Sequence, residues 1–117
     1  MKPVRLPGTG KKPSKYRNVA CYEDGYRFDS KRERDCFRWL KTLRRDGIVD
    51  YFLRQVPIHI APPGNHKTTA TTLRIDFLVF YHDERVRYID AKGKATKGWL
   101  DKAAVAENLY GIHIEVW

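Results

Sequence analysis

Two closely spaced apolar stretches constrain the fold of this chain more than any other feature. Residues 73–81 and 85–92 are rich in Leu, Ile, Val, Phe and Tyr, and only the polar triplet His82-Asp83-Glu84 separates them. Apolar, β-prone runs joined by a short polar turn are typical of neighbouring strands. We therefore predict a β-hairpin over this part of the chain.

The residues before this hairpin predict a smaller hairpin and a helix. Residues 19–28 carry two short apolar runs around Glu23-Asp24-Gly25, whose Asp-Gly step suits a tight turn. Ser30 is a good N-cap for a helix that ends at Asp46-Gly47. The expected inward stripe of this helix consists of Cys36, Phe37, Leu40 and Leu43.

A further strand is expected over residues 51–60, and a loop rich in Pro, Gly, Asn and Thr over residues 61–72. Pro57 indicates an edge or irregular position for this strand, because proline cannot donate a hydrogen bond to a ladder.

A second helix is expected over residues 99–110, after a loop of Lys and Gly over residues 93–98. Gly111 marks the end of this helix, and apolar residues alternate over 112–116 as a last strand. The helix residues expected to face the core are Leu100, Ala103, Ala104 and Leu109.

This order of elements predicts an α/β (α+β) fold with a central mixed β-sheet flanked by helices. A chain of 117 residues has room for one compact domain, which we place at residues 16–117. Residues 1–15 combine Pro, Gly and Lys without an acidic residue and are interpreted as a flexible basic arm. The arm is either a terminus without a role or a non-specific contact to phosphates.

The charge of the chain points to a polyanionic partner. Its 23 Lys and Arg residues outnumber its 14 Asp and Glu residues, so the formal net charge is +9. Nucleic acid is the common partner of so basic a domain, and an anionic membrane surface is the alternative. Solubility alone requires a much smaller imbalance.

Neither a membrane segment nor a structural zinc site is expected. No apolar run approaches the ~20 residues that span a bilayer, and no apolar stretch follows the basic N-terminus as in a signal peptide. Cys21 and Cys36 fit a reducing compartment, so we expect the protein in the cytoplasm. The cysteines lack close zinc-ligand partners. The histidines are scattered at His59, His66, His82 and His113.

Three residues of the central hairpin are candidates for chemistry. Asp76 interrupts a strongly apolar strand, where an unpaired carboxylate is costly. Asp90 and Lys92 are two residues apart and therefore share one face of a strand. If the strands pair, Asp76 approaches Asp90 at the end farthest from the turn, where the two carboxylates repel. Bound Mg²⁺ would relieve this repulsion, and structural pairing with nearby Arg74, Arg87 or Lys92 is the alternative.

Glu33 is a further candidate, with two interpretations that the residues leave open. It stands at the third helical position of a Ser-x-x-Glu capping box that begins at Ser30. It also begins the apolar stripe, so its side chain is expected to face the sheet. The carboxylate therefore serves as a helix cap, as a metal ligand, or as both.

The combination resembles the PD-(D/E)XK nuclease superfamily, and more closely its short phage-encoded endonucleases related to Holliday-junction resolvases. The resemblance covers roughly residues 15–117. It is carried by Lys15-Tyr16-Arg17-Asn18, Phe28-Asp29-Ser30-Lys31-Arg32-Glu33, Ile75-Asp76-Phe77 and Asp90-Ala91-Lys92-Gly93. Ile75 stands where the name of the superfamily has proline.

The resemblance implies a restriction-endonuclease-like core and Mg²⁺-dependent hydrolysis of DNA phosphodiester bonds, with Mn²⁺ as a substitute and a 5′-phosphate as product. It also implies branched or junction DNA as the substrate, and a homodimer. Lys92 would be the catalytic lysine, and Gln55, taken to begin a strand, matches a polar position in relatives. The implied metal ligands are Glu33, Asp76, Asp90 and the main-chain carbonyl of Ala91.

Basic residues flank both parts of this candidate site. The expected nucleic-acid contacts are Lys31, Arg32 and Arg34 near Glu33, and Lys94, Lys97 and Lys102 beyond Lys92. Solvated surfaces explain such charges too, but crowding on both sides of one site favours a phosphate-binding track. Trp99 lies among these lysines and is interpreted as a helix-packing residue.

Three hypotheses follow. The first is a metal-dependent, structure-selective DNA endonuclease. The second is a non-catalytic basic protein that binds DNA without needing Asp90 or Lys92. The third is a nuclease subunit whose cleavage requires a partner protein.

Overall fold

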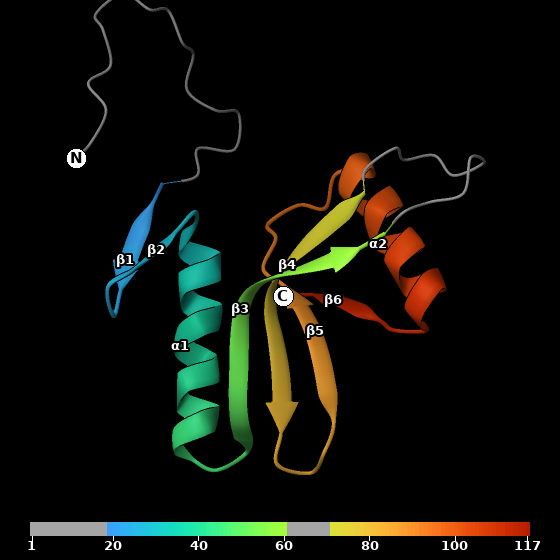
Figure 1. Ribbon diagram of the computed structural model, residues 1–117. Coiled ribbons are helices and arrows are strands. Elements are labelled where there is room, and N and C mark those ends of the chain that lie inside the picture. The colour runs from blue at the N-terminus through green and yellow to red at the C-terminus, as the bar shows by residue number, and fades with distance from the viewer. Residues whose placement is uncertain (1–18, 61–70) are drawn as a thin grey trace, which may run out of the picture.

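The computed structural model describes residues 19–60 and 71–117, which form two helices and six strands (Figure 1). In chain order these are β1 (Cys21–Glu23), β2 (Tyr26–Phe28), α1 (Lys31–Arg45), β3 (Val49–His59), β4 (Thr72–Tyr81), β5 (Val86–Asp90), α2 (Lys97–Tyr110) and β6 (Ile114–Val116). The mixed α+β fold that the sequence predicts is confirmed. The expected arm over residues 1–15 lies outside the described residues, as does the expected loop as far as residue 70.

The central sheet has the strand order β3-β4-β5-β6 among the described residues. The pairs β3–β4 and β4–β5 are antiparallel, whereas β6 runs parallel to β5. Parallel neighbours need a long crossover, which α2 provides. The predicted mixed sheet is thus confirmed, and β3, which contains Pro57, lies at its edge. The hairpin of β1 and β2 forms a separate two-stranded sheet beside the start of α1 (Figure 1).

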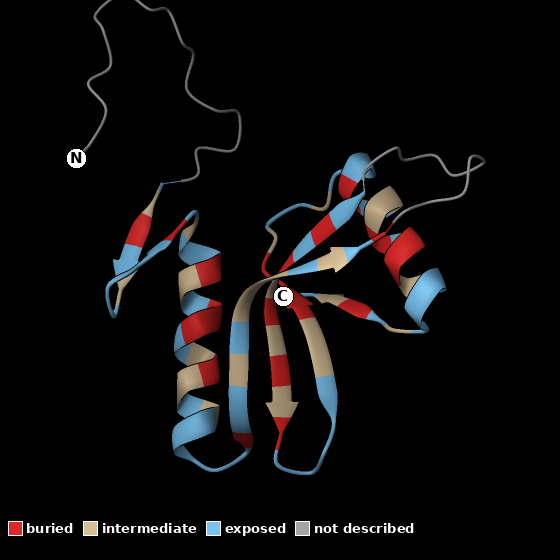
Figure 2. Ribbon diagram, in the orientation of Figure 1, coloured by how far each residue is buried: buried red, intermediate tan, exposed pale blue. Residues whose placement is uncertain are grey.

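Helix α1 begins where the capping pattern predicts. The Ser30 hydroxyl accepts a hydrogen bond from the backbone N–H of Glu33 at 3.1 Å, which satisfies one of the free donors of the first turn. The predicted stripe is confirmed, because Cys36, Phe37 and Leu40 are buried against the sheet, and Leu43 packs beside them. Figure 2 shows this buried side of α1 turned toward β3 and β4.

Helix α2 presents a different face to the core than the sequence predicts. It begins at Lys97, after the N-cap Thr96, and ends at Gly111 in the left-handed conformation, as expected from the glycine. Its buried residues are Trp99, Ala103, Val105 and Ala106. The expected positions Leu100, Ala104 and Leu109 are exposed, so that only Ala103 was placed correctly. The large indole of Trp99 enters the core and sets the rotation of the helix.

Strand β4 connects two clusters of buried side chains. Leu73 and Ile75, in its first half, pack with Trp99 and α2, whereas Phe77 and Val79, in its second half, pack with α1. Asp76 therefore stands at the boundary between the two clusters, between Ile75 of one and Phe77 of the other.

The described part of the chain contains no helix long and apolar enough to cross a membrane. Cys21 and Cys36 are buried free thiols.

Candidate functional site

Asp76 and Asp90 lie where β4 and β5 separate. The last paired residues of the two strands are Phe77 and Ile89. Beyond them, the backbone N–H of Asp76 donates to Asp90 Oδ1 at 3.1 Å, and the N–H of Ala91 donates to Asp76 Oδ2 at 2.9 Å. The two carboxylates thus replace backbone acceptors at the point where the ladder ends. The expected approach of Asp76 to Asp90, far from the turn, is confirmed.

Burial and repulsion make the Asp76 carboxylate a weak acid. Its pKa is raised to about 8, first because the group is removed from water, and then because it shares a hydrogen bond with Asp90 and is repelled by Asp90 and Glu33. The N–H of Ala91 opposes this rise. Burial and the neighbouring carboxylates thus favour the protonated form of Asp76, and a bound cation would have to replace that proton.

Glu33 joins the site from the first turn of α1. One oxygen, Oε2, accepts the backbone N–H of Asp29 at 3.2 Å, just before the helix, and the other, Oε1, accepts Gln55 Nε2 at 2.7 Å. The residue is only 4% exposed, and burial raises the pKa of its carboxylate. The structure therefore gives Glu33 a contact with the backbone just before the N-cap through one oxygen and a contact within the site through the other.

Gln55 links the two carboxylates that face each other. Its Nε2 donates to Glu33 Oε1 and also to Asp76 Oδ1 at 3.3 Å. It lies in the middle of β3 rather than at the start of a strand, which corrects the sequence-based placement. Its φ of +54° is left-handed, a conformation that costs a residue with a Cβ atom about 1–3 kcal/mol. Such strain in mid-strand directs the Gln55 amide toward the site.

Asp90 is held inside the protein rather than at the surface of the site. It is 1% exposed, and its Oδ2 accepts Trp99 Nε1 at 2.6 Å. Lys92 Nζ lies 3.5 Å from the same oxygen. The sequence places Asp90 and Lys92 together, and the structure does so too. However, Lys92 borders the adjoining pocket, whereas Asp90 stands behind its wall.

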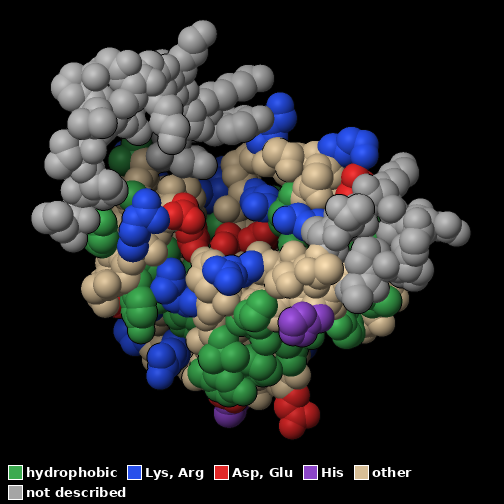
Figure 3. All heavy atoms as spheres, turned by 45° about the horizontal axis from the view of Figure 1, so that its top comes forward, with side chains coloured by type: hydrophobic (Ala, Val, Ile, Leu, Met, Phe, Trp, Pro, Cys, Tyr) green, Lys and Arg blue, Asp and Glu red, His purple; other side chains and the backbone are tan. Residues whose placement is uncertain are grey.

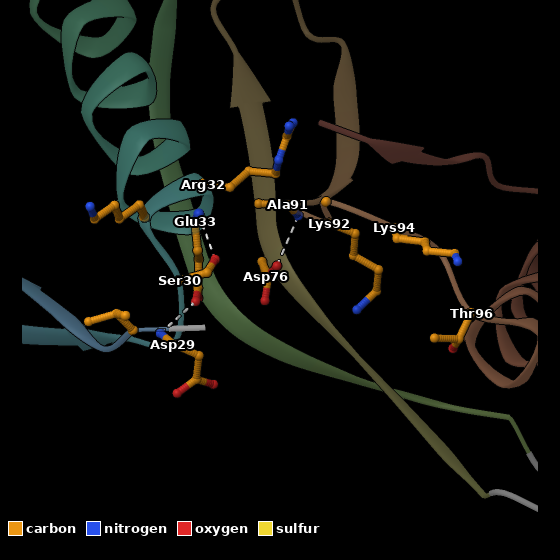
Figure 4. A pocket seen from close by; sticks show the side chains of 12 residues that line it. Asp29, Ser30, Arg32, Glu33, Asp76, Ala91, Lys92, Lys94 and Thr96 are labelled. Carbon is orange, nitrogen blue, oxygen red and sulfur yellow. Dashed lines mark hydrogen bonds between the residues drawn. The ribbon is translucent and has the colours of Figure 1, made fainter. Parts of the chain in front are cut away.

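A pocket of about 760 Å³ opens where the starts of both helices meet the end of β5 (Figure 4). Among the described residues, its lining comprises Val19, Asp29, Ser30, Lys31, Arg32, Glu33, Asp76, Ala91, Lys92, Gly93, Lys94 and Thr96. In Figure 4 Glu33 from α1 and Asp76 from β4 lie side by side, and Lys92 approaches from the segment after β5. Figure 3 shows acidic side chains in a hollow with Lys and Arg around it.

The basic residues predicted to contact nucleic acid divide into two groups. Lys31, Arg32 and Lys94 border the pocket. Lys97 pairs with Asp101 at 2.8 Å and Arg34 lies 3.5 Å from Asp35, and neither side chain borders the pocket. Lys102 lies on α2 and does not border the pocket.

The donor atoms of the pocket suit a hard cation. Carboxylate and carbonyl oxygens are the ligands that Mg²⁺ prefers, and it is commonly bound through one or two carboxylates and the phosphates of a substrate. Glu33 and Asp76 supply two such carboxylates, and Ala91 borders them. Within residues 19–60 and 71–117, no cluster of three or more Asp, Glu, His or Cys side chains is arranged to hold an ion.

Sequence reasoning missed Arg54. Its guanidinium lies 4.0 Å from Glu33 Oε1 and packs against the rings of Tyr26 and Phe28, with centroids 4.7 and 4.4 Å away. It lowers the pKa of Glu33 and thus opposes the effect of burial. The available signal was the same one that marked Asp76, a charged residue within a strand of mainly apolar residues.

A family model described as "Protein of unknown function (DUF1064)" matches residues 13–112, and the chain belongs to this family. No curated protein and no solved structure matches the chain.

Proposed function

We propose that this protein is a metal-dependent endonuclease of the PD-(D/E)XK type that hydrolyses DNA phosphodiester bonds. The observation that carries the proposal is the meeting of Glu33, Asp76 and Lys92 in one basic pocket. The raised pKa of Asp76 adds support, since buried carboxylates with acidic neighbours are common at functional sites. The net charge of +9 favours a nucleic acid over a neutral substrate.

Glu33 and Asp76 would hold Mg²⁺ or Mn²⁺ on the floor of the pocket, with the Ala91 carbonyl as a further oxygen donor. When bound there, the cation supplies Lewis acidity toward the scissile phosphate and lowers the pKa of an attacking water. Gln55 keeps the two carboxylates together before the substrate arrives, through its contacts with both. Arg54 lowers the pKa of Glu33 and so opposes the effect of its burial.

Lys92 is the group best placed to act on the phosphate itself. Its ammonium borders the pocket and is 30% exposed, whereas its neighbour Asp90 is covered. A positive charge aimed at the position of the phosphate stabilises the negative charge that develops there. Lys31, Arg32 and Lys94 would hold the flanking phosphates. Such contacts fix the position of the DNA and do not read its sequence.

Within this proposal the substrate is branched or junction DNA and the protein acts as a homodimer, because paired cuts in two strands need two sites. We further propose that it acts in the cytoplasm, where the thiols of Cys21 and Cys36 would stay reduced.

The test is cleavage of labelled duplex, nicked, single-stranded and four-way-junction DNA with Mg²⁺, Mn²⁺ or EDTA. We expect cleavage only with a metal ion, and losses of at least about 100-fold in D76N and K92A. D83N, which alters an exposed carboxylate in the turn at the far end of the same hairpin, is the matched control and should cleave as the wild type does. Equal cleavage by D76N and D83N would refute the assignment of the site.

One observation favours the second hypothesis, a DNA-binding protein without catalysis. Of the three expected ligand carboxylates, only Glu33 and Asp76 border the pocket, since Asp90 is directed toward Trp99. The same assay separates the two functions. A non-catalytic protein would bind the DNA and release no product with either metal. Its D76N variant would bind the DNA as well as the wild type does.

A further inference from the structure

The side chain of Trp99 contacts two residues of the candidate site at once. Its Nε1 donates to Asp90 Oδ2 at 2.6 Å, in a bond between two buried side chains. Its ring lies beneath the Lys92 ammonium, whose Nζ is 5.3 Å from the ring centroid. The indole of Trp99 thus donates a hydrogen bond to a buried carboxylate and packs against a nearby ammonium group.

The position of Trp99 is itself rigidly defined. Its backbone N–H donates to the hydroxyl of Thr96, the N-cap of α2, at 3.2 Å. Its ring packs in the cluster that contains Ile75, Ala103 and Ala106, and the residue is 8% exposed. The indole therefore moves only with helix α2.

Without the indole N–H, Asp90 Oδ2 would have Lys92 as its remaining partner among the described residues. At 3.5 Å, Lys92 Nζ is close to this oxygen but beyond the 2.7–2.9 Å of a strong charge-assisted hydrogen bond. A buried carboxylate that loses a donor binds the nearest cation more tightly, because leaving it unpaired is costly. The ammonium would then move toward Asp90 and away from the pocket.

We infer that Trp99 is a positioning residue for the site. It satisfies Asp90 so that this carboxylate orients the backbone of Asp76 and leaves Lys92 available to the substrate. The inference rests on the proposed nuclease function and deepens it. Trp99 is not a catalytic residue, since it does not border the pocket.

The decisive variant is W99F, which keeps an aromatic ring in the core and beneath Lys92 but removes the N–H. We expect kcat for DNA cleavage to fall about 10- to 100-fold, the effect of one hydrogen bond to a charged group, with KM for DNA nearly unchanged. The matched control is W39F, which alters a tryptophan that stacks on Trp117 at a ring distance of 5.9 Å, away from the pocket. It should retain wild-type kcat.

NMR of the metal-free protein tests the hydrogen bond from Trp99 to Asp90 directly. The chain has three tryptophans and therefore three indole N–H signals. The Trp99 signal, assigned by its absence in W99F, should lie downfield, exchange slowly with water, and shift in D90N. The Trp39 signal should not shift in D90N. A Trp99 signal that is unchanged in D90N would overturn the inference without any assay of activity.

The kinetic outcomes separate this inference from the proposed function. Cleavage by the wild type combined with equal kcat in W99F and W39F would overturn the role of Trp99 alone. A wild type that cleaves none of the DNA substrates would overturn the proposed function, and with it a positioning role. A fall in kcat confined to W99F would support both.

Discussion

At the scale of single residues, the raised pKa of Asp76 determines how the site responds to pH. The pKa of this carboxyl is about 8 in the folded protein and about 3.9 in an unfolded chain. Between these two pH values the folded state binds a proton that the unfolded state has lost. Its contribution to stability is therefore fully present below about pH 4 and is lost as the pH rises through 8. A divalent cation bound as proposed would compete with this proton for the same oxygen atoms.

This competition predicts a pH-dependent stability in the metal-free protein. In EDTA, the melting temperature should fall by at least about 5 °C between pH 6 and pH 9, as the native protein loses the proton of Asp76. The fall should be much smaller in D76N, which has no carboxyl to titrate. Mn²⁺ should raise the melting temperature more at pH 9 than at pH 6. Scanning calorimetry with and without Mn²⁺ checks this, and equal pH profiles for the wild type and D76N would contradict the pKa assigned to Asp76.

The left-handed backbone of Gln55 makes a second prediction at this scale. Replacement by either alanine or glycine removes the amide that joins Glu33 and Asp76, but only glycine adopts φ near +54° without steric cost. Q55G should therefore be more stable than Q55A by about 1 kcal/mol, while both lose affinity for Mn²⁺ to a similar degree. Denaturant unfolding and Mn²⁺ titration measure the two effects separately. Greater stability of Q55A than of Q55G would show that the backbone is not strained there.

Individual residues were predicted with unequal success. The sequence singles out Asp76, Glu33 and Lys92 as candidates because charged groups at these strand and helix positions need a partner. This signal is local in the sequence. The burial of Asp90 behind the pocket, and its bond to Trp99, depend on the rotation of α2, which involves tertiary packing. The left-handed φ of Gln55 has no local signature, since glycine and asparagine are the residues that usually indicate it.

At the scale of secondary structure, the start of α1 connects fold and site. The cap at Ser30 fixes the first turn of this helix, and that turn carries Glu33 into the pocket. S30A should lower the free energy of unfolding by about 1 kcal/mol, the usual cost of losing such a cap. It should also weaken Mn²⁺ binding, because the first turn would no longer hold Glu33 in place. Denaturant titration and Mn²⁺ binding test both effects, and a loss of stability without any loss of affinity would show that the cap does not position Glu33.

Most elements were predictable because their signals are short-range. The sequence predicts three of these features where the structure has them: the Asp24-Gly25 turn, the cap at Ser30 and the helix end at Gly111. The inward face of α2 was not predictable from spacing, because its alanines fit more than one apolar stripe. The entry of Trp99 into the cluster of Ile75 and Ala106 decides between these stripes.

At the scale of the whole molecule, the surplus of positive charge should govern binding to DNA. Every phosphate neutralised by a lysine or arginine contributes about 0.9 to the slope of log affinity against log salt for duplex DNA. Lys94 borders the pocket, whereas Lys97 is paired with Asp101. K94A should therefore lower this slope by about one unit, and K97A should leave it nearly unchanged. Fluorescence anisotropy at several salt concentrations, in Ca²⁺ to prevent cleavage, distinguishes the two variants, and equal slopes would contradict the phosphate-binding role of Lys94.

The central claim is that Glu33 and Asp76 together bind a divalent cation, and anomalous diffraction from a crystal soaked in Mn²⁺ at pH 8.5 or above tests it most directly. The account predicts a single strong anomalous peak in the pocket, about 2.0–2.3 Å from an oxygen of each carboxylate, with the bond from Gln55 to at least one of them displaced. The account would be contradicted by a soaked crystal in which this position holds no peak and Gln55 still joins the two side chains.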